Sequence, residues 1–480
     1  MLFNSLTFLI FFVAVVFLYY VLPYKYSRIM LFFASCIFYM WWNPIFIFLI
    51  MGVTAINYLS AIFIEKYKKQ KKFILALVML FNFGQLIFFK YLNFFSNCIT
   101  YMLSLVKIET CIPEFSVILP MGISFFTFQA ASYTIDVYTG KYPAEKSFFK
   151  VALFITFFPQ LVAGPIERAD RLLKRLFEKH SFKLSNLSEG IKLMLMGYFK
   201  KVVISDRASI LVDAVYNSPT DYKGLSLIIA TLFFTVQIYC DFSGYTDIAI
   251  GCARVMDIDL MKNFDRPYFA TSIKDFWRRW HISLSTWFRD YLYIPLGGSR
   301  CSVLKKYFNI LVTFFVSGLW HGANITFVLW GGLHGIYQII GDIKDKYILK
   351  GRKIDALVPL KIIITFCLVS FAWIFFRANS LSDATYIIKN LFSDIASYSD
   401  LQYVYEVLRS FSLKTYEMLI LVYACVFLFF SDMISFKYDI HTLLKKTGFP
   451  IRFAYYYVLI IFILAGGVFT NGGQFIYFQF

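Results

Sequence analysis

The stretch FNILVTFFVSGLWHGANITFVLWGGLHGIYQIIG, residues 308–341, contains no Asp, Glu, Lys or Arg over 34 residues. A helix needs roughly 20 apolar residues to cross the hydrocarbon core of a bilayer. The stretch is therefore long enough for two passes. His321 lies 13 residues from its start, at a depth where an ionisable side chain is costly and by default marks function.

Similar uncharged runs extend along the whole chain. They comprise residues 5–22, 31–64, 73–89, 115–135, 151–166, 224–240, 362–376, 418–431 and 453–480. The second run is long enough for two passes, or for one pass and a re-entrant piece, with residues 41–44 (WWNP) as the break. By length alone we expect roughly 11 transmembrane helices.

The composition of the chain points the same way. Hydrophobic residues make up 59% and charged residues 16% of the 480 residues, and the mean hydropathy is +0.65. A water-soluble domain is about half apolar and about one quarter charged. This chain has too little polar surface to cover a soluble body, so we predict an all-α integral membrane protein that forms a single domain.

The chain is strongly basic, with a net charge of +18. Its Lys and Arg residues flank the apolar runs instead of forming one stripe, so binding to nucleic acid is not indicated. Clusters at residues 66–72, 168–179 and 344–353 are typical of cytoplasmic loops under the positive-inside rule. The eight cysteines are scattered without a CxxC pair, so we expect neither a disulfide framework nor a metal site.

Two stretches do not look like simple spans. Residues 242–300 mix Trp, Tyr, Arg, Asp and Gly densely. Irregular backbone at membrane depth must be buried in protein or line a wet cavity, so we expect a cavity-lining, re-entrant or interfacial segment there. Residues 378–413 are polar and weakly amphipathic, and we expect them to form an extracytoplasmic loop.

The five histidines of the chain are not equivalent. His321 is the strongest candidate for chemistry because of its depth in the apolar stretch. His281 lies in FWRRWHIS (276–283), where it is either part of an interfacial aromatic belt or part of a site in which Arg holds an anion. His334 is more consistent with a structural role.

Other reaction classes are poorly supported, because the chain has no GxSxG elbow, P-loop or HExxH motif. Seven carboxylates crowd one region, and they are Asp241, Asp247, Asp257, Asp259, Asp265, Asp275 and Asp290. Acids of this kind are compatible with an ion-coupled transporter. Basic residues lie close to them in the sequence, so ion pairing is the simpler interpretation.

Several motifs occur together in a characteristic order. They are LPMGISF (119–125), FPQLVAGPI (158–166), YCDFSGYTD (239–247), FWRRWHISLS (276–285), RDYLYIPLGG (289–298) and GLWHGA (318–323). With them the sequence resembles, over nearly its whole length, the membrane-bound O-acyltransferase (MBOAT) superfamily. It is most similar to the branch of bacterial alginate and peptidoglycan O-acetyltransferase membrane subunits, and more distantly to the D-alanyl-transfer protein of teichoic acids.

The resemblance implies a helix-ringed fold with a central tunnel. The histidine of the Trp-His-Gly motif, His321, is then the catalytic residue, and the histidine of the Arg-Arg-Trp-His motif, His281, is a second active-site residue. The resemblance also implies a cytosolic thioester as donor substrate, for which we expect acetyl-CoA, and no permanently bound cofactor. Arg278, Arg279 and Arg289 are candidates to bind its phosphates. His281 or Asn324 would stabilise the oxyanion.

The acceptor is less defined by the sequence. Residues 475–480 (FIYFQF) are either an aromatic helix end or, by a looser resemblance to the small partner proteins of teichoic acid D-alanylation, an acyl relay through Tyr477. We expect a multi-pass protein of the bacterial cytoplasmic membrane. We also expect a separate extracytoplasmic, hydrolase-like partner and a cell-envelope polysaccharide as final acceptor. The alternative to an enzyme is an ion-coupled transporter or a non-catalytic scaffold of such a complex.

Overall fold

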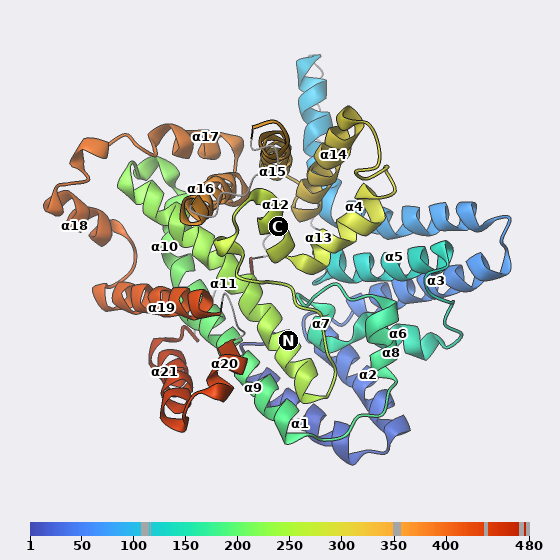
Figure 1. Cartoon of the computed structure of the whole chain (residues 1–480). Coiled ribbons are helices and arrows are strands. Elements are labelled where there is room, and N and C mark those ends of the chain that lie inside the picture. Colours follow the sequence, from blue (N-terminus) through green and yellow to red (C-terminus); the bar gives the residue numbers. More distant parts are fainter. Residues whose placement is uncertain (107–114, 116, 349–356, 436–439, 470–474, 477–480) are drawn as a thin grey trace. The chain divides into compact units, whose positions relative to one another are not determined.

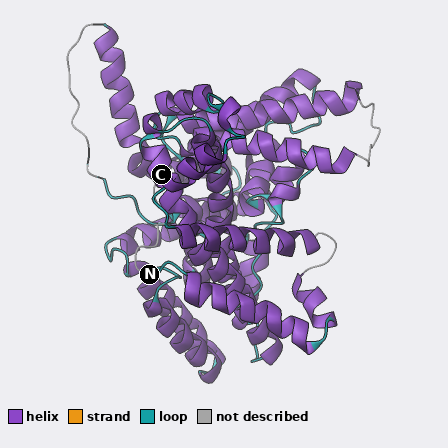
Figure 2. Cartoon of the chain, turned by 90° about the vertical axis from the view of Figure 1, so that its left-hand side faces the viewer, coloured by secondary structure: helices purple, strands orange, loops and turns teal. Residues whose placement is uncertain are grey.

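A computed structural model describes residues 1–106, 115, 117–348, 357–435, 440–469 and 475–476. Within these residues the regular elements are all helices, joined by loops and without a β-strand, as expected (Figures 1 and 2). The contacts group the residues into two compact units, and the single domain stays a prediction. Unit 1 comprises Met1–Ile191 and Ala249–Met261, and unit 2 comprises Lys192–Ile248 and Lys262–Phe480.

Unit 1 contains the first helices of the chain. They are α1 (Leu6–Val21), α2 (Tyr24–Met40), α3 (Phe46–Lys66), α4 (Lys71–Leu105), α5 (Ile123–Thr139), α6 (Phe148–Thr156), α7 (Phe158–Leu161), the π-helix η1 (Ala169–Leu173), α8 (Lys174–Leu176) and the first part of α9 (Leu184–Tyr198). The break between α2 and α3 falls at residues 41–45, which confirms the break that we predicted at WWNP.

Unit 2 begins in α9 and contains the candidate site. Its first elements are the π-helix η2 (Phe199–Ser205), α10 (Asp206–Asn217), η3 (Pro219–Asp221), most of α11 (Leu225–Val255), η4 (Pro267–Phe269), α12 (Ile273–Arg279), α13 (Ile282–Phe288), η5 (Arg289–Tyr293), α14 (Val303–His321), α15 (Ile325–Ile343) and η6 (Lys344–Ile348). They are followed by α16 (Val358–Arg377), α17 (Leu381–Asn390), η8 (Ile395–Ser397), α18 (Leu401–Ser410), α19 (Thr415–Ile434), α20 (Ile440–Lys446) and α21 (Phe449–Gly466).

Among the described residues, six helices are long and apolar enough to cross a membrane, namely α3, α4, α11, α16, α19 and α21. The apolar helix α1 is shorter. The chain is thus a multi-pass membrane protein, but the number of 11 spans is not confirmed. α14 and α15 are not among the six, because Lys305 and Lys306 in α14, and His334, Gln338 and Asp342 in α15, lower their mean hydropathy.

Helix α11 is longer than the sequence suggested. We expected the span to end near Cys240 and an irregular segment to begin at Phe242, whereas α11 continues without a break to Val255. Polar residues in its second half do not interrupt it, because distant lysines neutralise them. Asp241 pairs with Lys201 and Asp247 pairs with Lys200, with Nζ–O distances of 2.7 and 2.8 Å.

Two glycines allow these lysines to reach α11. A Cβ atom on Gly197 would lie 2.6 Å from the carbonyl oxygen of Gly244, and a Cβ atom on Gly244 would lie 2.8 Å from that of Gly197. Real side chains do not approach so closely, so only glycine at both positions permits this crossing. The end of α9 and the π-helix η2 therefore lie directly against α11.

Helices α14 and α15 form a hairpin that is also packed through glycines (Figure 1). A Cβ atom on Gly331 would lie 2.3 Å from the carbonyl oxygen of Phe314, and one on Gly318 would lie 2.3 Å from that of Phe327. The hairpin turns at residues 322–324, in the middle of the long uncharged stretch. The close packing fixes the position of His321, which is the last residue of α14.

Residues 378–413 form two short helices, α17 and α18, which are joined through η8. The first is tied to the start of unit 2 by the Tyr386 hydroxyl, which donates to the carbonyl oxygens of Thr220 and Tyr222 at 3.2 Å each. That this segment faces the outside of the cell stays a prediction.

Candidate active site

The rings of His281 and His321 both pack against Trp320 in unit 2. The ring centroids of His281 and Trp320 are 6.0 Å apart, and those of Trp320 and His321 are 4.8 Å apart. His281 is 0% and His321 is 3% exposed. The fold therefore brings the two histidines, 40 positions apart in the chain, into one buried aromatic cluster.

His281 occupies the short link between α12 and α13, where its φ of +43° places the backbone in the left-handed region. Its imidazole Nδ1 lies 3.1 Å from Oδ1 of Asn263. The same oxygen accepts hydrogen bonds from the backbone N–H of Ser283 at 3.1 Å and from its hydroxyl at 2.9 Å. Because this oxygen is an acceptor, the neutral histidine carries its proton on Nδ1 and presents the lone pair of Nε2.

The electrostatics of His281 favour this neutral form. It lies outside the six candidate spans, and burial lowers its pKa to about 3. Transfer of an imidazolium into such an apolar environment is unfavourable. His281 is therefore uncharged at neutral pH, and its Nε2 is a hydrogen-bond acceptor rather than a donor.

His321 is enclosed by aromatic rings. Apart from Trp320, its centroid lies 4.9 Å from that of Trp330 and 5.3 Å from that of Phe376. A Cβ atom on Gly322, the next residue, would lie 2.1 Å from the Phe327 ring. The space beside this glycine is thus filled by protein, and the glycine serves packing.

His334 has a structural environment, in agreement with the sequence. It is fully buried in α15, and its Nδ1 accepts a hydrogen bond of 3.3 Å from the indole N–H of Trp277. Its ring also packs against Trp330 at 5.1 Å. These contacts hold α12 against α15.

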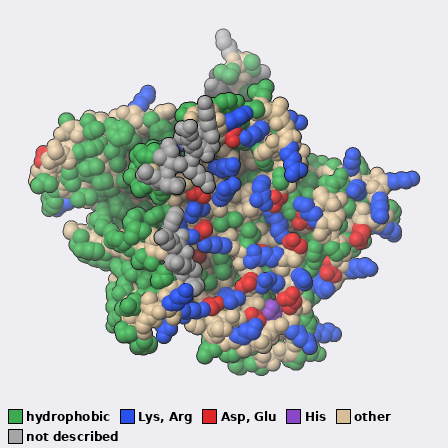
Figure 3. All heavy atoms as spheres, in the orientation of Figure 1, with side chains coloured by type: hydrophobic (Ala, Val, Ile, Leu, Met, Phe, Trp, Pro, Cys, Tyr) green, Lys and Arg blue, Asp and Glu red, His purple; other side chains and the backbone are tan. Residues whose placement is uncertain are grey.

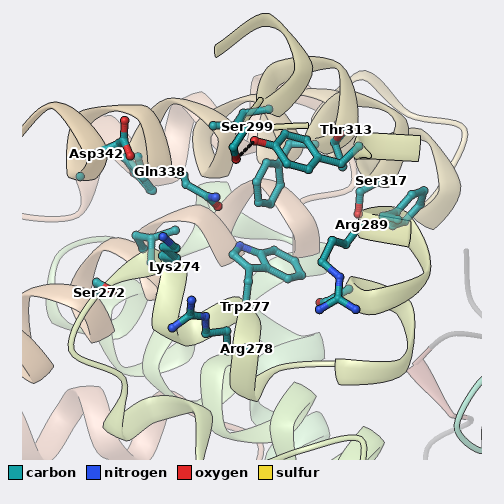
Figure 4. Close-up of a pocket in the computed structure, with 18 of the residues that line it drawn as sticks. Ser272, Lys274, Trp277, Arg278, Arg289, Ser299, Thr313, Ser317, Gln338 and Asp342 are labelled. Carbon is teal, nitrogen blue, oxygen red and sulfur yellow. Dashed lines mark hydrogen bonds between the residues drawn. The ribbon is translucent and has the colours of Figure 1, made fainter. Parts of the chain in front are cut away.

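A pocket of about 520 Å³ opens beside this cluster, between α12, α13, α14 and α15 (Figure 4). The cationic residues that line it are Lys274, Arg278, Arg289 and Lys306, and the acidic ones are Asp342 and Asp345. Figure 4 shows Lys274, Arg278 and Arg289 arranged around Trp277. Basic side chains also gather on the surface around α12 and α13 (Figure 3).

Of the three arginines predicted to bind a donor, Arg278 and Arg289 line this pocket and Arg279 does not. Arg279 instead donates to Asp275 at 3.0 Å and to the carbonyl oxygen of Asp265 at 3.5 Å, so it holds the local backbone together. Lys274 was not predicted, although its spacing of four residues from Arg278 on a helix places both on one face.

The pocket approaches both histidines without including them among its lining residues. Ser317 lines it and precedes His321 by four residues, about 6 Å along α14. Ile282 lines it and follows His281 directly. The pocket therefore extends from a cationic rim to the edge of the aromatic cluster, but a continuous tunnel is not confirmed.

Asn324 has two structural tasks. Its Oδ1 caps α15 by accepting from the backbone N–H of Thr326 at 3.1 Å, and its Nδ2 donates to the carbonyl oxygen of Asn379 at 3.1 Å. These bonds give no support to the role of oxyanion donor that we predicted for it. Tyr477 lies outside the described residues, whereas Phe475 and Ile476 are described and buried in unit 2.

The crowded carboxylates form ion pairs. The pairs are Asp241 with Lys201, Asp247 with Lys200, Asp257 with Lys183, Asp259 with Arg175 and Arg254, Asp265 with Lys262 and Arg266, Asp275 with Arg279, and Asp290 with Arg289. This confirms the simpler interpretation of these acids. Their arrangement does not favour an ion-coupled transporter.

Comparison with known proteins agrees with this geometry. Residues 144–381 match the model of the membrane-bound O-acyltransferase family, and this range includes both histidines and the pocket. The chain is 39% identical over 402 residues to a probable alginate O-acetylase of Pseudomonas aeruginosa, covering 82% of this chain and 75% of the relative. It is 35% identical over 427 residues to a peptidoglycan O-acetyltransferase of Helicobacter pylori, with 82% and 80% covered.

A more distant relative is a teichoic acid D-alanyltransferase of Bacillus subtilis, which is 28% identical over 284 residues, with 56% of this chain and 71% of the relative covered. These relatives bear out the resemblance that the sequence motifs indicated. The extent of the match to the first two, together with the family model, identifies this chain as a member of the membrane-bound O-acyltransferase family and as an O-acyltransferase.

Proposed function

We propose that this enzyme transfers an acetyl group from a cytosolic acyl thioester, acetyl-CoA, towards a cell-envelope polysaccharide outside the bacterial cytoplasmic membrane. The observation that carries the proposal is the pair of buried histidines around Trp320, next to a pocket with a cationic rim. The names of the relatives, which refer to alginate, peptidoglycan and teichoic acid, support a polysaccharide acceptor.

The donor would bind in the pocket. Coenzyme A is a polyanion, and guanidinium groups form paired, charge-assisted hydrogen bonds to phosphate oxygens. Arg278 and Arg289 are exposed at the rim and would bind the phosphates, with Lys274 adding charge. The acyl end would then point toward Ser317 and the aromatic cluster.

His321 would act as the general base. An acceptor hydroxyl gives its proton to the imidazole while its oxygen attacks the thioester carbonyl carbon. The tetrahedral intermediate then expels the thiolate, which takes up the proton, so that one ester and one free thiol result. His281, neutral and fixed by Asn263, would use the Nε2 lone pair to orient the hydroxyl.

We had expected His281 or Asn324 to stabilise the oxyanion. A neutral His281 whose proton lies on Nδ1 has no proton to donate to an oxyanion from Nε2. The second histidine therefore suits the recognition of the hydroxyl better than the stabilisation of negative charge.

The immediate acceptor in this proposal is a tyrosine of the chain itself. The Tyr477 phenol would take the acetyl group first, and a hydrolase-like partner outside the membrane would pass it to a sugar hydroxyl. Phenols have a pKa near 10 and leave more readily than alkyl alcohols, so an acetyl-tyrosine stays activated. Tyr477→Phe should then abolish acetylation at normal expression, and unchanged acetylation would exclude the relay.

The central test is His321→Gln in the native host. Loss of a general base should reduce acetylation of the envelope polymer by roughly 10²–10⁴-fold, measured by mass spectrometry of the released acetyl groups. His180→Gln is the matched control, because His180 belongs to unit 1, bonds to the carbonyl oxygen of Arg175 and is not among the residues that line the pocket. Wild-type acetylation in the His321 variant would leave only a scaffold role.

A further inference from the structure

The last residue of α21, Gly466, and the segment that follows it, which together we call the distal segment, bond to the rest of unit 2 at three described residues. Arg207 donates from Nη2 to the carbonyl oxygen of Gly466 at 2.6 Å. The backbone N–H of Val468 donates to the carbonyl oxygen of Val202 at 2.9 Å. The backbone N–H of Ile476 donates to Oδ2 of Asp241 at 2.7 Å.

The third attachment involves a buried ion cluster. Lys201, on η2, lies 2.7 Å from Oδ1 of Asp206 and 2.7 Å from Oδ1 of Asp241, and all three side chains are buried. The two oxygens of Asp241 thus have separate partners, the lysine and the N–H of Ile476. A carboxylate acceptor makes a stronger bond to a backbone N–H than a neutral group does.

Aromatic contacts accompany this bond. Phe475 is buried, and its ring centroid lies 4.8 Å from that of Tyr245 and 5.7 Å from that of Phe242. Phe242 in turn lies 4.5 Å from His281, edge to face. The distal segment is therefore one ring away from a predicted active-site histidine.

We propose that Asp241, Lys201, Phe242 and Tyr245 form a socket that binds Phe475 and Ile476, and that Asp241 is a positioning residue for the distal segment. The purpose of the socket, which is to hold this segment for acyl transfer, rests on the proposed function. Its binding to the segment does not depend on any acyl transfer.

A neighbouring pair provides an internal comparison. Lys200 directly precedes Lys201 on η2, and Asp247 follows Asp241 by six residues on α11. These two residues form an ion pair of 2.8 Å. Among the described residues Lys200 and Asp247 bond to each other and not to Gly466, Val468 or Ile476, and their side chains retain some exposure to solvent. Two ion pairs of the same type are therefore available, of which one holds the segment.

The experiment uses the protein shortened by its last seven residues, 474–480, and purified in detergent. The ligand is a synthetic peptide of residues 470–480 with a fluorophore at its N-terminus. Fluorescence anisotropy should show saturable binding. Asp241→Asn in the truncated chain should weaken binding by roughly 10-fold, because a charged acceptor is replaced by a neutral one. Asp247→Asn should leave the affinity unchanged.

A modified peptide removes any dependence on the folding of variants. Methylation of the backbone nitrogen of Ile476 deletes the donor and leaves the protein untouched, and it should also weaken binding by roughly 10-fold. Equal affinity of the methylated and unmethylated peptides, or equal loss in both Asp variants, would overturn the socket. A peptide with Tyr477→Phe should bind normally, so failure of the relay and failure of the socket give different results.

Discussion

His281 illustrates how much at this site is decided by single residues. A histidine in the left-handed backbone region is strained, by roughly 1–2 kcal/mol, and it is held there by the surrounding bonds. Ile282 donates its N–H to the carbonyl oxygen of Asn263 at 2.9 Å, while the Asn263 side chain binds the imidazole. Asn263 therefore fixes both the backbone and the tautomer of His281.

From this we predict the effect of Asn263→Ala. The Nδ1–H of His281 loses its buried acceptor, and the ring is no longer restricted to one tautomer. Loss of such a bond costs roughly 1–3 kcal/mol, so kcat should fall roughly 10–100-fold with a smaller change in KM for the donor. Steady-state kinetics with acetyl-CoA would check this, and an unchanged kcat would contradict the orienting role.

The lowered pKa of His281 has a consequence for stability. Its folded pKa of about 3 lies below the ordinary value of 6.5, so the stabilisation is complete above pH 6.5 and is lost as the pH falls toward 3. Between pH 7 and pH 5 the loss should be about 2 kcal/mol, since 1.5 pH units separate 5 from 6.5. Thermal unfolding in detergent should show a smaller pH dependence for His281→Asn than for the wild type. Equal pH dependence would refute a buried neutral imidazole.

The sequence allowed prediction of some site residues and not of others. His321 could be proposed from the sequence because an ionisable side chain within a 34-residue uncharged stretch is costly and by default marks function. Asn263 was not, because an asparagine in a polar loop carries no signal until the fold places it under His281. Lys306 was missed because it lies at the start of an apolar run, and only the α14–α15 hairpin brings it to the pocket.

At the level of helices, the α14–α15 hairpin depends on glycine. Gly331→Ala would force a methyl group to within 2.3 Å of the Phe314 carbonyl oxygen, so the hairpin must separate. We expect destabilisation of roughly 1–3 kcal/mol. The control is Gly341→Ala in the same helix, where nothing lies within 4 Å and higher helix propensity should stabilise by up to about 1 kcal/mol. Opposite shifts in melting temperature are expected, and equal shifts would contradict the close packing.

The helices also show where prediction from sequence succeeds. Uncharged runs correctly indicated a break between α2 and α3, at a stretch that contains Asn43 and Pro44, and a run long enough for the two helices of the α14–α15 hairpin. The assumption that charged residues end a span placed the end of α11 too early. Its partners Lys200 and Lys201 come from a different part of the chain, so the compensation of Asp241 and Asp247 is not visible locally.

At the scale of the whole molecule, the net charge of +18 and the cationic rim should attract an anionic donor. We predict that KM for acetyl-CoA rises with ionic strength, because salt screens exposed charges beyond about 8 Å at physiological concentration. The double variant Arg278→Gln/Arg289→Gln should raise KM roughly 10-fold and weaken the salt dependence.

Arg279→Gln is the control for this prediction. It removes a neighbouring arginine whose bonds go to Asp275 and the Asp265 carbonyl oxygen. Its KM should be unchanged even if the melting temperature falls. A rise in KM equal to that of the double variant would place Arg279 at the donor after all.

Composition was sufficient to predict a polytopic helical membrane protein, because a chain with 16% charged residues cannot cover itself in water. It was insufficient for the number of spans. Long uncharged runs divide into broken helices such as α6 and α7. In α11, 67% of the apolar 18-residue stretch that could cross the membrane is buried in protein and does not face lipid. The hydropathy of a sequence does not distinguish a helix that is enclosed by protein from one that faces lipid.

The π-helix η2 joins α9 to α10 and determines how one helix is turned relative to the other. Lys200 and Lys201 lie within it, and the helices before and after it are α-helical. A π-helix has the wider i→i+5 turn, so the removal of one residue from η2 would favour ordinary α-helical bonding and would displace Lys200 and Lys201 relative to α11. The two lysines would exchange or lose their carboxylates, and the grip on Gly466 and Val468 would shift with them. A single-codon deletion there should therefore uncouple features that no point substitution separates.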